Sequence, residues 1–138
     1  MPTIASSYAD TGTPTLQVSD ARGLMVRAVQ FHRRQANDPL ETRVNHQRFD
    51  VAGRLVASRD PYLFALAETE QQIPENMTQH LSLSGAPLVT DSLDAGCRLA
   101  LLGHTGQVVE RWDGRGSHAL TEFDALMRPV SVRERGRD

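Results

Sequence analysis

The sequence predicts a mainly β chain of consecutive antiparallel hairpins in a curved sheet, with one short helix near residues 61–72. Three observations support this prediction. A short turn pattern recurs along the chain. Extended, partly alternating runs flank its copies, as expected of two strands joined by a tight turn. One segment departs from the pattern and carries a helix-capping residue followed by apolar residues at helical spacing.

The clearest copy of the turn runs from Asp50 to Gly53, between extended runs that end at Phe49 and begin at Arg54. Asp favours the first position of a type I turn, because its carboxylate can accept backbone N–H groups two residues on. Gly at the fourth position tolerates the positive φ that a turn followed by a bulge requires. This stretch therefore predicts an antiparallel hairpin.

Six approximate copies of this turn are present, and their first positions, here called slots, fall at residues 20, 50, 82, 103, 113 and 124. The structural turn positions predicted from them are Asp20, Gly23, Asp50, Gly53, Gly85, Gly106, Asp113, Gly116 and Asp124. Ser82 and Gly103 replace the slot Asp, and Met127 replaces the turn Gly. Single turns of this kind occur in any β protein, but sustained self-similarity indicates repeats that bury their faces on their neighbours.

Residues 1–14 are rich in Ser, Thr, Gly and Pro and lack periodicity, so a flexible N-terminal tail is expected there. Extended runs at 15–19 and 24–33 predict the first hairpin. The polar run at 34–41 contains Asn and Asp before a Pro, which favours a loop. The hairpin repeat region is predicted to cover residues 15–132.

Asp60 is suited to cap a helix, and Pro61 fits the first helical position. Apolar residues at helical spacing follow, which predicts the short helix over 61–72. From residue 77 to residue 132 the sequence is typical of short strands with tight turns. Residues 133–138 are predicted to form a charged C-terminal end outside the repeats.

Composition limits the function classes. The 138 residues fit one domain, and the net charge of −2 gives no electrostatic footprint for nucleic acid or a membrane surface. Hydrophobic residues make up 39%, below the average of about 45–50%, so some burial is expected from another chain or from further sequence.

The N-terminus lacks the regions of a Sec signal peptide, and no apolar run approaches the roughly 20 residues that span a bilayer. A soluble product made in the cytoplasm is expected.

No constellation predicts catalysis, a cofactor or a metal. The five histidines are His32, His46, His80, His104 and His118. The closest pairs are 14 residues apart, unlike the short spacings of zinc sites, so solvated or sheet-face roles are favoured. Glycines at 103–106 and 113–116 lack the lysine and helix of a phosphate-binding loop. Cys97, the single cysteine, is predicted to be a buried free thiol. An enzyme is therefore the least favoured class.

Several motifs occur in a fixed order. They lie at residues 13–24, 29–33, 41–50, 58–63, 84–88 and 92–96. Ser58 to Leu63 is similar to an S-x-D-P-R-L stretch, and the last two segments to G-x-P-L followed by S-V-D-A-G. This order resembles the N-terminal portion of TcC-type C components of bacterial ABC toxin complexes, within the wider Rhs/YD-repeat family. The resemblance covers about residues 13–132.

The resemblance implies that the repeats coil, together with a B component, into a hollow β-sheet cocoon around a C-terminal toxic region released by aspartyl self-cleavage. No position here matches the self-cleavage motif, so no catalytic residue is carried over. The expected function is a structural, non-enzymatic segment of that shell, made in the bacterial cytoplasm and secreted, if at all, within a toxin complex. The expected partner is a TcB-like or other Rhs-repeat chain, or the remainder of a longer chain of its own. No contact with nucleic acid and no membrane insertion is expected.

An alternative stays open. The chain could be a free-standing small adaptor, or an immunity-like or chaperone-like binding protein for a toxin. Exposed sheet edges, which proteins normally pair or cover, favour docking on a larger repeat partner. The sequence leaves open whether the chain is a fragment, a truncated form or a complete small protein.

Overall fold

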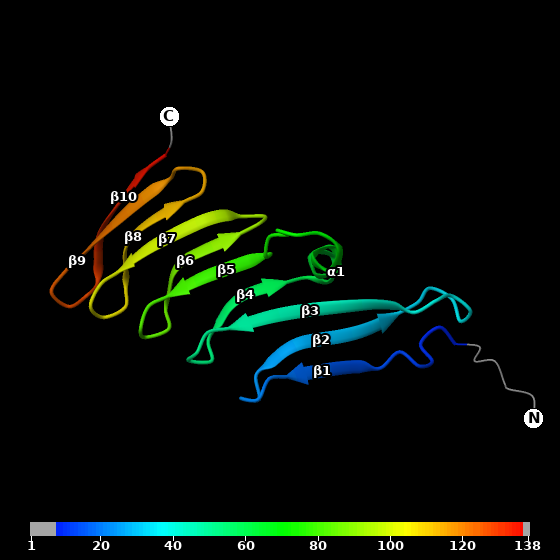
Figure 1. Ribbon diagram of the computed structural model, residues 1–138. Coiled ribbons are helices and arrows are strands. Elements are labelled where there is room, and N and C mark those ends of the chain that lie inside the picture. The colour runs from blue at the N-terminus through cyan, green and yellow to red at the C-terminus, as the bar shows by residue number, and fades with distance from the viewer. Residues whose placement is uncertain (1–7, 137–138) are drawn as a thin grey trace, which may run out of the picture.

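The computed structural model describes residues 8–136, which form one open sheet of ten antiparallel strands and one helix (Figure 1). The elements in chain order are β1 (Thr15–Ser19), β2 (Met25–His32), β3 (Glu41–Phe49), β4 (Leu55–Arg59), α1 (Pro61–Thr69), β5 (Met77–Leu81), β6 (Pro87–Ser92), β7 (Gly96–Leu102), β8 (Val108–Asp113), β9 (His118–Phe123) and β10 (Pro129–Arg135). Every sheet neighbour is also a sequence neighbour. The predicted mainly β class with one helix is confirmed.

The structure shifts three predicted boundaries. The helix ends at Thr69 rather than at residue 72. Strand β10 continues to Arg135, three residues beyond the predicted end of the repeat region, because Arg133–Arg135 pair with β9. In the predicted tail, residues 8–14 form turns, and the Arg33 guanidinium donates hydrogen bonds to the carbonyl oxygens of Ala9 and Thr11. Residues 1–7 and 137–138 lie outside the described residues.

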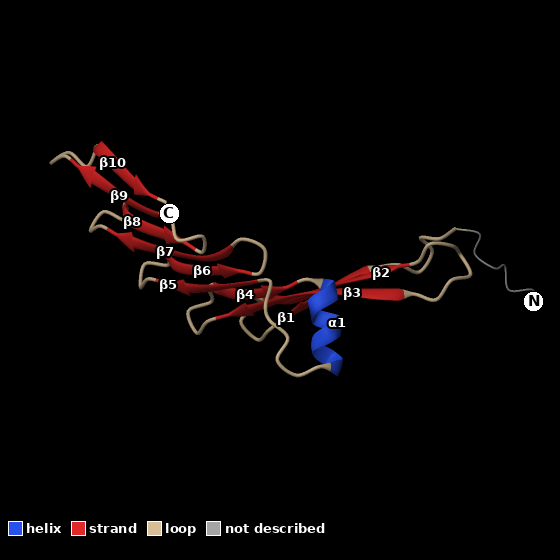
Figure 2. Cartoon of the chain, turned by 90° about the horizontal axis from the view of Figure 1, so that it is seen from above, coloured by secondary structure: helices blue, strands red, loops and turns tan. Residues whose placement is uncertain are grey.

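The sheet is a single curved layer, with α1 on one of its faces beside β3 and β4 (Figure 2). Among the described residues only Ala57, Leu63 and Ala119 are buried apolar residues. The accessible surface is 10402 Å², whereas a compact monomer of this mass exposes about 7,100 Å². The chain therefore has almost no core of its own and leaves an unusually large surface open.

All six predicted turns have the same backbone hydrogen bonds. The fourth residue donates its N–H to the slot carbonyl at 2.9–3.1 Å, and the slot N–H donates to the residue after the turn at 2.8–3.1 Å. The five turn glycines have φ between 79° and 90°, and Met127, in the sixth turn, has φ 60°. The replacements at Ser82, Gly103 and Met127 therefore do not prevent the turn from forming.

The slot side chain reinforces the turn. Asp50 Oδ1 accepts hydrogen bonds from the backbone N–H groups of Ala52 and Arg54, both at 2.9 Å. The carboxylates of the other slot aspartates, Asp20, Asp113 and Asp124, accept the equivalent pair of N–H groups.

Two turns replace this carboxylate with another acceptor. Where Ser82 stands in the slot, its hydroxyl accepts from Ala86 N at 3.1 Å. In the turn that begins at Gly103, the side chain of Gln107 accepts from Thr105 N at 3.1 Å instead. The repeat thus keeps the hydrogen bond even where it has lost the aspartate.

Five of the turns lie along one margin of the sheet, here called the turn margin, while the turn at 113–116 lies at the opposite margin (Figure 1). Consecutive hairpins join in one constant register. The residue seven positions after a slot pairs with the residue four positions before the next slot on the turn margin. The four pairs are Arg27 with His46, Ala57 with Thr78, Val89 with Leu99, and Glu110 with Leu120. Each hairpin therefore adds to the sheet in the same way.

Candidate interaction surface

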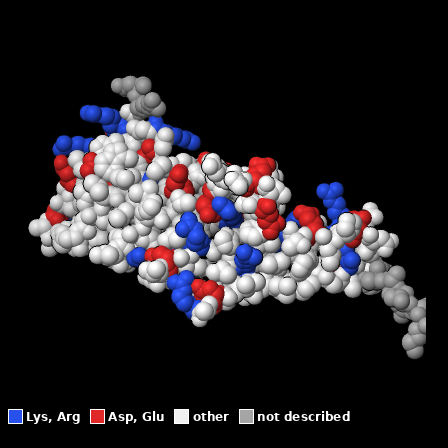
Figure 3. Space-filling model, in the orientation of Figure 1, with Lys and Arg blue, Asp and Glu red and all other residues white. Residues whose placement is uncertain are grey.

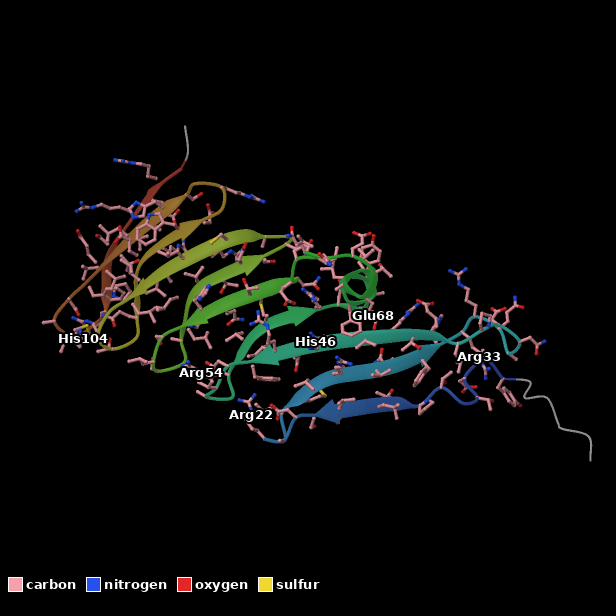
Figure 4. The ribbon with its side chains drawn as sticks, viewed as in Figure 1. Arg22, Arg33, His46, Arg54, Glu68 and His104 are labelled. Carbon is pink, nitrogen blue, oxygen red and sulfur yellow. The ribbon has the colours of Figure 1, made fainter. Side chains whose placement is uncertain are left out.

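Side chains on the turn margin connect one hairpin turn to the next. Arg22 Nε donates to Asp20 Oδ2 in its own turn at 2.9 Å, and Arg22 Nη1 donates to the carbonyl oxygen of Asp50 in the following turn at 2.6 Å. Figure 4 shows Arg22 and Arg54 on these two successive turns. The slot carboxylate orients the guanidinium, whose free edge then reaches the neighbouring turn.

Arg54 repeats this arrangement one hairpin later. Its Nε donates to Asp50 Oδ2 at 2.7 Å, and its Nη1 donates to the carbonyl oxygen of Ser82 at 2.7 Å. A guanidinium carries five N–H donors in a fixed fork, so one side chain can hold its own carboxylate and a second acceptor together. Both arginines therefore bind the slot carbonyl of the next turn.

The later turns continue the same direction of donation. Gln107, directly after the turn at 103–106, donates from Nε2 to Met127 Sδ in the turn at 124–127 at 3.5 Å. Between the turns that begin at Ser82 and Gly103, within residues 8–136, no side-chain bridge is formed. Ala86 occupies the position that Arg54 holds one hairpin earlier. In each bridged pair the earlier turn donates to the later one.

The turn at 124–127 is followed by an arginine whose guanidinium is oriented in the same way as that of Arg54. Arg128 Nε donates to Asp124 Oδ2 at 2.7 Å, as Arg54 does to Asp50. The side chain of Arg128 is 72% exposed, against 33% for Arg54. Within residues 8–136 its guanidinium has no second acceptor. Arg128 is thus an oriented donor at the end of the turn margin.

Hydrogen bonds to the slot carboxylates favour their charged form. The pKa of Asp50 is lowered by the backbone N–H and then by the guanidinium of Arg54. The pKa of Asp124 is lowered by Arg128 in the same order, and that of Asp113 by the backbone N–H of Ser117. For Asp20, desolvation raises the pKa, but hydrogen bonds led by that from the Arg22 side chain outweigh it. These carboxylates are therefore charged at neutral pH.

The helix is held on the sheet by both its start and its apolar side. Asp60 accepts from Leu63 N at 2.8 Å as the N-cap and from Asn76 Nδ2 at 2.9 Å. The Phe64 ring lies 5.7 Å from the ring of His46, measured between centroids, with the Arg27 guanidinium carbon 5.4 Å from the Phe64 centroid. Burial, followed by the charge of Arg27, lowers the pKa of His46. This histidine is therefore part of a packing contact.

A second aromatic contact joins β8 and β9. The rings of Trp112 and His118 stack with centroids 5.0 Å apart and planes at 12°. His118 Nε2 lies 2.6 Å from Glu110 Oε1. The two residues belong to neighbouring strands of the sheet, and within residues 8–136 no serine or cysteine side chain forms a hydrogen bond with His118. The group is a cross-strand pairing and has no nucleophile.

The histidines do not assemble a metal site. No group of three or more His, Cys, Asp or Glu side chains that could hold a metal occurs within the described residues. His32, His80 and His104 lie on β2, on β5 and in the turn at 103–106. His32 Nδ1 is 3.8 Å from Glu41 Oε2. The prediction that Cys97 is buried was wrong, because its strand β7 has no covering layer and the thiol is exposed.

The C-terminal strands curve around a groove of about 730 Å³. Arg98, Arg111, Ala119 and Glu134 are among its lining residues. Arg111 Nη2 pairs with Glu134 Oε1 across it at 2.8 Å. The groove is open and is lined by side chains of both charges, so it offers a surface rather than an enclosed site. Figure 3 shows acidic and basic side chains interspersed on the visible face, without one large patch of either sign.

No protein-family profile matches the chain. The toxin subunit YenC1 of Yersinia entomophaga is 30% identical over 125 residues, which are 90% of this chain and 13% of YenC1. A crystal structure of TcdB2-TccC3 superposes with a TM-score of 0.87 at 32% identity, over 93% of this chain and 6% of that one. The chain is a TcC-like repeat segment.

The TcC-like segment also matches the Tc holotoxin pore of Photorhabdus luminescens, with a TM-score of 0.87 at 32% identity. It superposes equally well, with a TM-score of 0.88, on TcdB2-TccC3 without the hypervariable C-terminal region. The segment spans about an eighth of YenC1 and less still of the solved chains. None of its helices among residues 8–136 is long and apolar enough to cross a membrane.

Proposed function

We propose that this TcC-like segment is a structural, non-enzymatic part of the wall of a toxin-encapsulating shell. The observation that carries this proposal is the open single-layer sheet, whose hairpins join in one register and whose outer strands β1 and β10 each pair on one side only within residues 8–136. Such a strip can extend but cannot enclose a core. The proteins that it resembles are a Tc toxin subunit and the solved TcdB2-TccC3.

The large exposed surface supports assembly with a larger repeat chain, either a TcB-like or other Rhs-repeat protein or the remainder of a longer chain of its own. The accessible area exceeds that of a compact monomer by about 3,300 Å². Permanent protein interfaces bury areas of this size, on the order of 2,000–5,000 Å². A wall segment would leave the cell only within the assembled toxin complex, and it needs no catalytic group of its own.

Size-exclusion chromatography with light scattering tests the proposal on the purified chain, alone and mixed with a TcB-like repeat protein. We expect self-association or partial order alone, and a stable, β-rich complex in the mixture. Leu16→Lys places a charge on the β1 edge strand and should weaken the complex. Val51→Lys, at a turn tip where the side chain is 99% exposed, is the matched control. A compact monomer that ignores the partner would favour the adaptor or immunity-like alternative.

A further inference from the structure

The joint between β4 and β5 is the least continuous place in the sheet. These strands share only the pairs Ala57 with Thr78 and Ser58 with Met77, the shortest ladder between any two neighbouring strands of residues 8–136. Residues 60–76, which include α1, are inserted between them. Among the described elements, α1 contacts only β3 and β4. The sheet therefore consists of two units, β1–β4 with α1 and β5–β10.

A reciprocal pair of hydrogen bonds, here called the Asp60–Asn76 clasp, closes this joint. The Asp60 N–H donates to Asn76 Oδ1 at 2.6 Å, and Asn76 Nδ2 donates to Asp60 Oδ2 at 2.9 Å. The backbone of Asn76 bonds to both units. Its N–H donates to the carbonyl oxygen of Ser58 on β4, and its carbonyl accepts the N–H of Leu93 after β6, both at 2.9 Å. Asn76 therefore ties the start of the helix to the strands on either side of the joint.

An ion pair lies beside the clasp. Arg59 Nε is 3.1 Å from Glu75 Oε2, and Arg59 Nη2 donates to the carbonyl oxygen of Ile73 at 2.8 Å. Arg48 Nε on β3 is 3.9 Å from Glu75 Oε1. The Glu75 side chain is 15% exposed, the lowest value among the ion-paired side chains within residues 8–136. Polar side chains thus hold the segment before β5 against β3 and β4, where the ladder is short.

The clasp works in one arrangement only. The pKa of Asp60 is lowered by the backbone N–H of Leu63 and then by the side chain of Asn76, so the carboxylate is charged at neutral pH. A charged carboxylate only accepts hydrogen bonds, whereas the amide of Asn76 has one oxygen that accepts and one nitrogen that donates. Each polar atom in the clasp therefore meets its complement, and no other orientation of the amide achieves this.

We propose that the β4–β5 joint is a hinge at which the curvature of the ribbon changes, and that the Asp60–Asn76 clasp holds it closed. Release of the clasp lets the two units turn against each other while the ladders inside each unit persist. A hinge is a short stretch at the ends of elements that absorbs the motion, and local opening is easiest where few bonds cross. This inference goes beyond the proposed function, because a wall segment needs only a fixed curvature.

Exchanging the two side chains tests the clasp. Asp60→Asn keeps an oxygen for the Leu63 N–H but sets one amide nitrogen against another, and Asn76→Asp sets two carboxylates face to face. Each single variant should speed exchange of the residue 76 amide, after intrinsic correction, by roughly tenfold, because about one kcal/mol of hydrogen bonding across the joint is lost. The double variant again pairs one donor with one acceptor and should recover most of the protection. Asn45→Asp, on an exposed β3 residue whose side chain forms no hydrogen bond within residues 8–136, is the matched control and should have no effect at the joint.

Spin-label distances measure the motion itself. In a Cys97→Ser background, Gln30→Cys on β2 and Arg98→Cys on β7 place labels at exposed positions on the two units. Five strand spacings put them on the order of 20–25 Å apart. Dilution with unlabelled chain restricts the signal to distances within one molecule. We expect a narrow distribution in the parent chain, a clearly broader one with Asn76→Asp, and a narrow one again in the double variant.

A second label pair separates hinge motion from general loosening. His80→Cys on β5 and Arg133→Cys on β10 are also five strand spacings apart but lie in one unit. Their distribution should not change when the clasp is broken. Equal broadening of both pairs, no broadening of either, or a double variant no better than the single ones would each overturn the proposal. Loss of the whole β signal in circular dichroism of both single variants would overturn it too, since the joint would then not open separately.

Discussion

Arg54 Nη1 lies 2.7 Å from the carbonyl oxygen of Ser82, so one side chain joins two turns whose bonded residues are 28 positions apart. The strands behind these turns, β4 and β5, share only the pairs Ala57 with Thr78 and Ser58 with Met77. The arginine therefore contributes to a joint that has few ladder bonds.

Replacing Arg54 should loosen that joint. We expect Arg54→Ala to destabilise it by on the order of 1 kcal/mol, the usual net value of a hydrogen bond in a partly exposed position. Amide hydrogen exchange around Gly85 should become severalfold faster, and Arg54→Lys should not restore protection, because an ammonium lacks the fork geometry. Arg43→Ala is the control, since Arg43 pairs with Glu41 on its own strand. Equal exchange in both alanine variants would contradict the assigned role.

Met127 is strained where the other turns have glycine. Its φ of 60° belongs to the left-handed region, which costs a residue with a Cβ about 1–2 kcal/mol. Met127→Gly should therefore stabilise the β9–β10 hairpin by about 1 kcal/mol, reduced slightly by loss of the Gln107 contact. Urea titration followed by exchange of β10 amides measures this effect.

The reciprocal change provides the control for Met127. Gly106 has φ 84° and no atom within 4 Å of an added Cβ, so Gly106→Ala isolates backbone strain from steric overlap. We expect it to destabilise the β7–β8 hairpin by about 1 kcal/mol. If both substitutions act in the same direction, backbone strain does not explain the difference between glycine and methionine in this turn.

Much of this fold is readable from the sequence, because Asp and Gly report a local turn geometry. The pattern predicts all six turns and, with Asp60 and Pro61, the helix. The sequence does not reveal that Gln107 replaces the missing slot carboxylate, since that contact depends on the folded turn. Nor does it show that the turns donate to one another, because a guanidinium that pairs with its own Asp looks like a solvated ion pair.

The wrong prediction that Cys97 is buried came from a general tendency of cysteines that does not apply to this sheet. Free cysteines are usually buried, but that tendency assumes that a sheet face is covered by a second layer. Here α1 covers only the region of β3 and β4, and β7 has no such cover. The predicted shortage of apolar residues agrees with the small number of buried residues, yet it could not indicate which strands remain exposed.

Acid should weaken the turns that have an aspartate slot. Their folded pKa values are lowered, so their contribution is fully present above the unfolded value, near 3.9, and is lost as the pH falls through the folded values. Hydrogen exchange corrected for intrinsic rates should show opening below about pH 4 at slots 50, 113 and 124. Asp124→Asn keeps an acceptor but no charge and should remove this dependence locally. The turn at Gly103, which has no slot carboxylate and accepts no arginine from a preceding turn, is the internal control, and an identical acid response there would refute the assignment.

The helix contact should respond in a higher pH range. The folded pKa of His46 is lowered, so folding favours the neutral ring, and this contribution is lost as the pH falls from about 6.5 through the folded value. Helix amides near Phe64 should exchange faster at pH 5 than at pH 7.5, after intrinsic correction. His46→Phe keeps an aromatic contact without a titrating group and should abolish the difference. His104→Phe, in an exposed turn, should leave it unchanged.

The position of the insertions has a consequence for how such chains can vary. Successive slots on the turn margin are 30, 32, 21 and 21 residues apart, yet the register between hairpins is the same. The additional residues lengthen β2, β3 and the loop between them, and form α1 with its flanks, at the margin opposite the turns. Length variation on that side leaves the pleat undisturbed, whereas one residue gained within a turn would invert the faces of every following side chain. Insertions are therefore tolerated at the margin opposite the turns, whereas the turn margin keeps the register between hairpins constant.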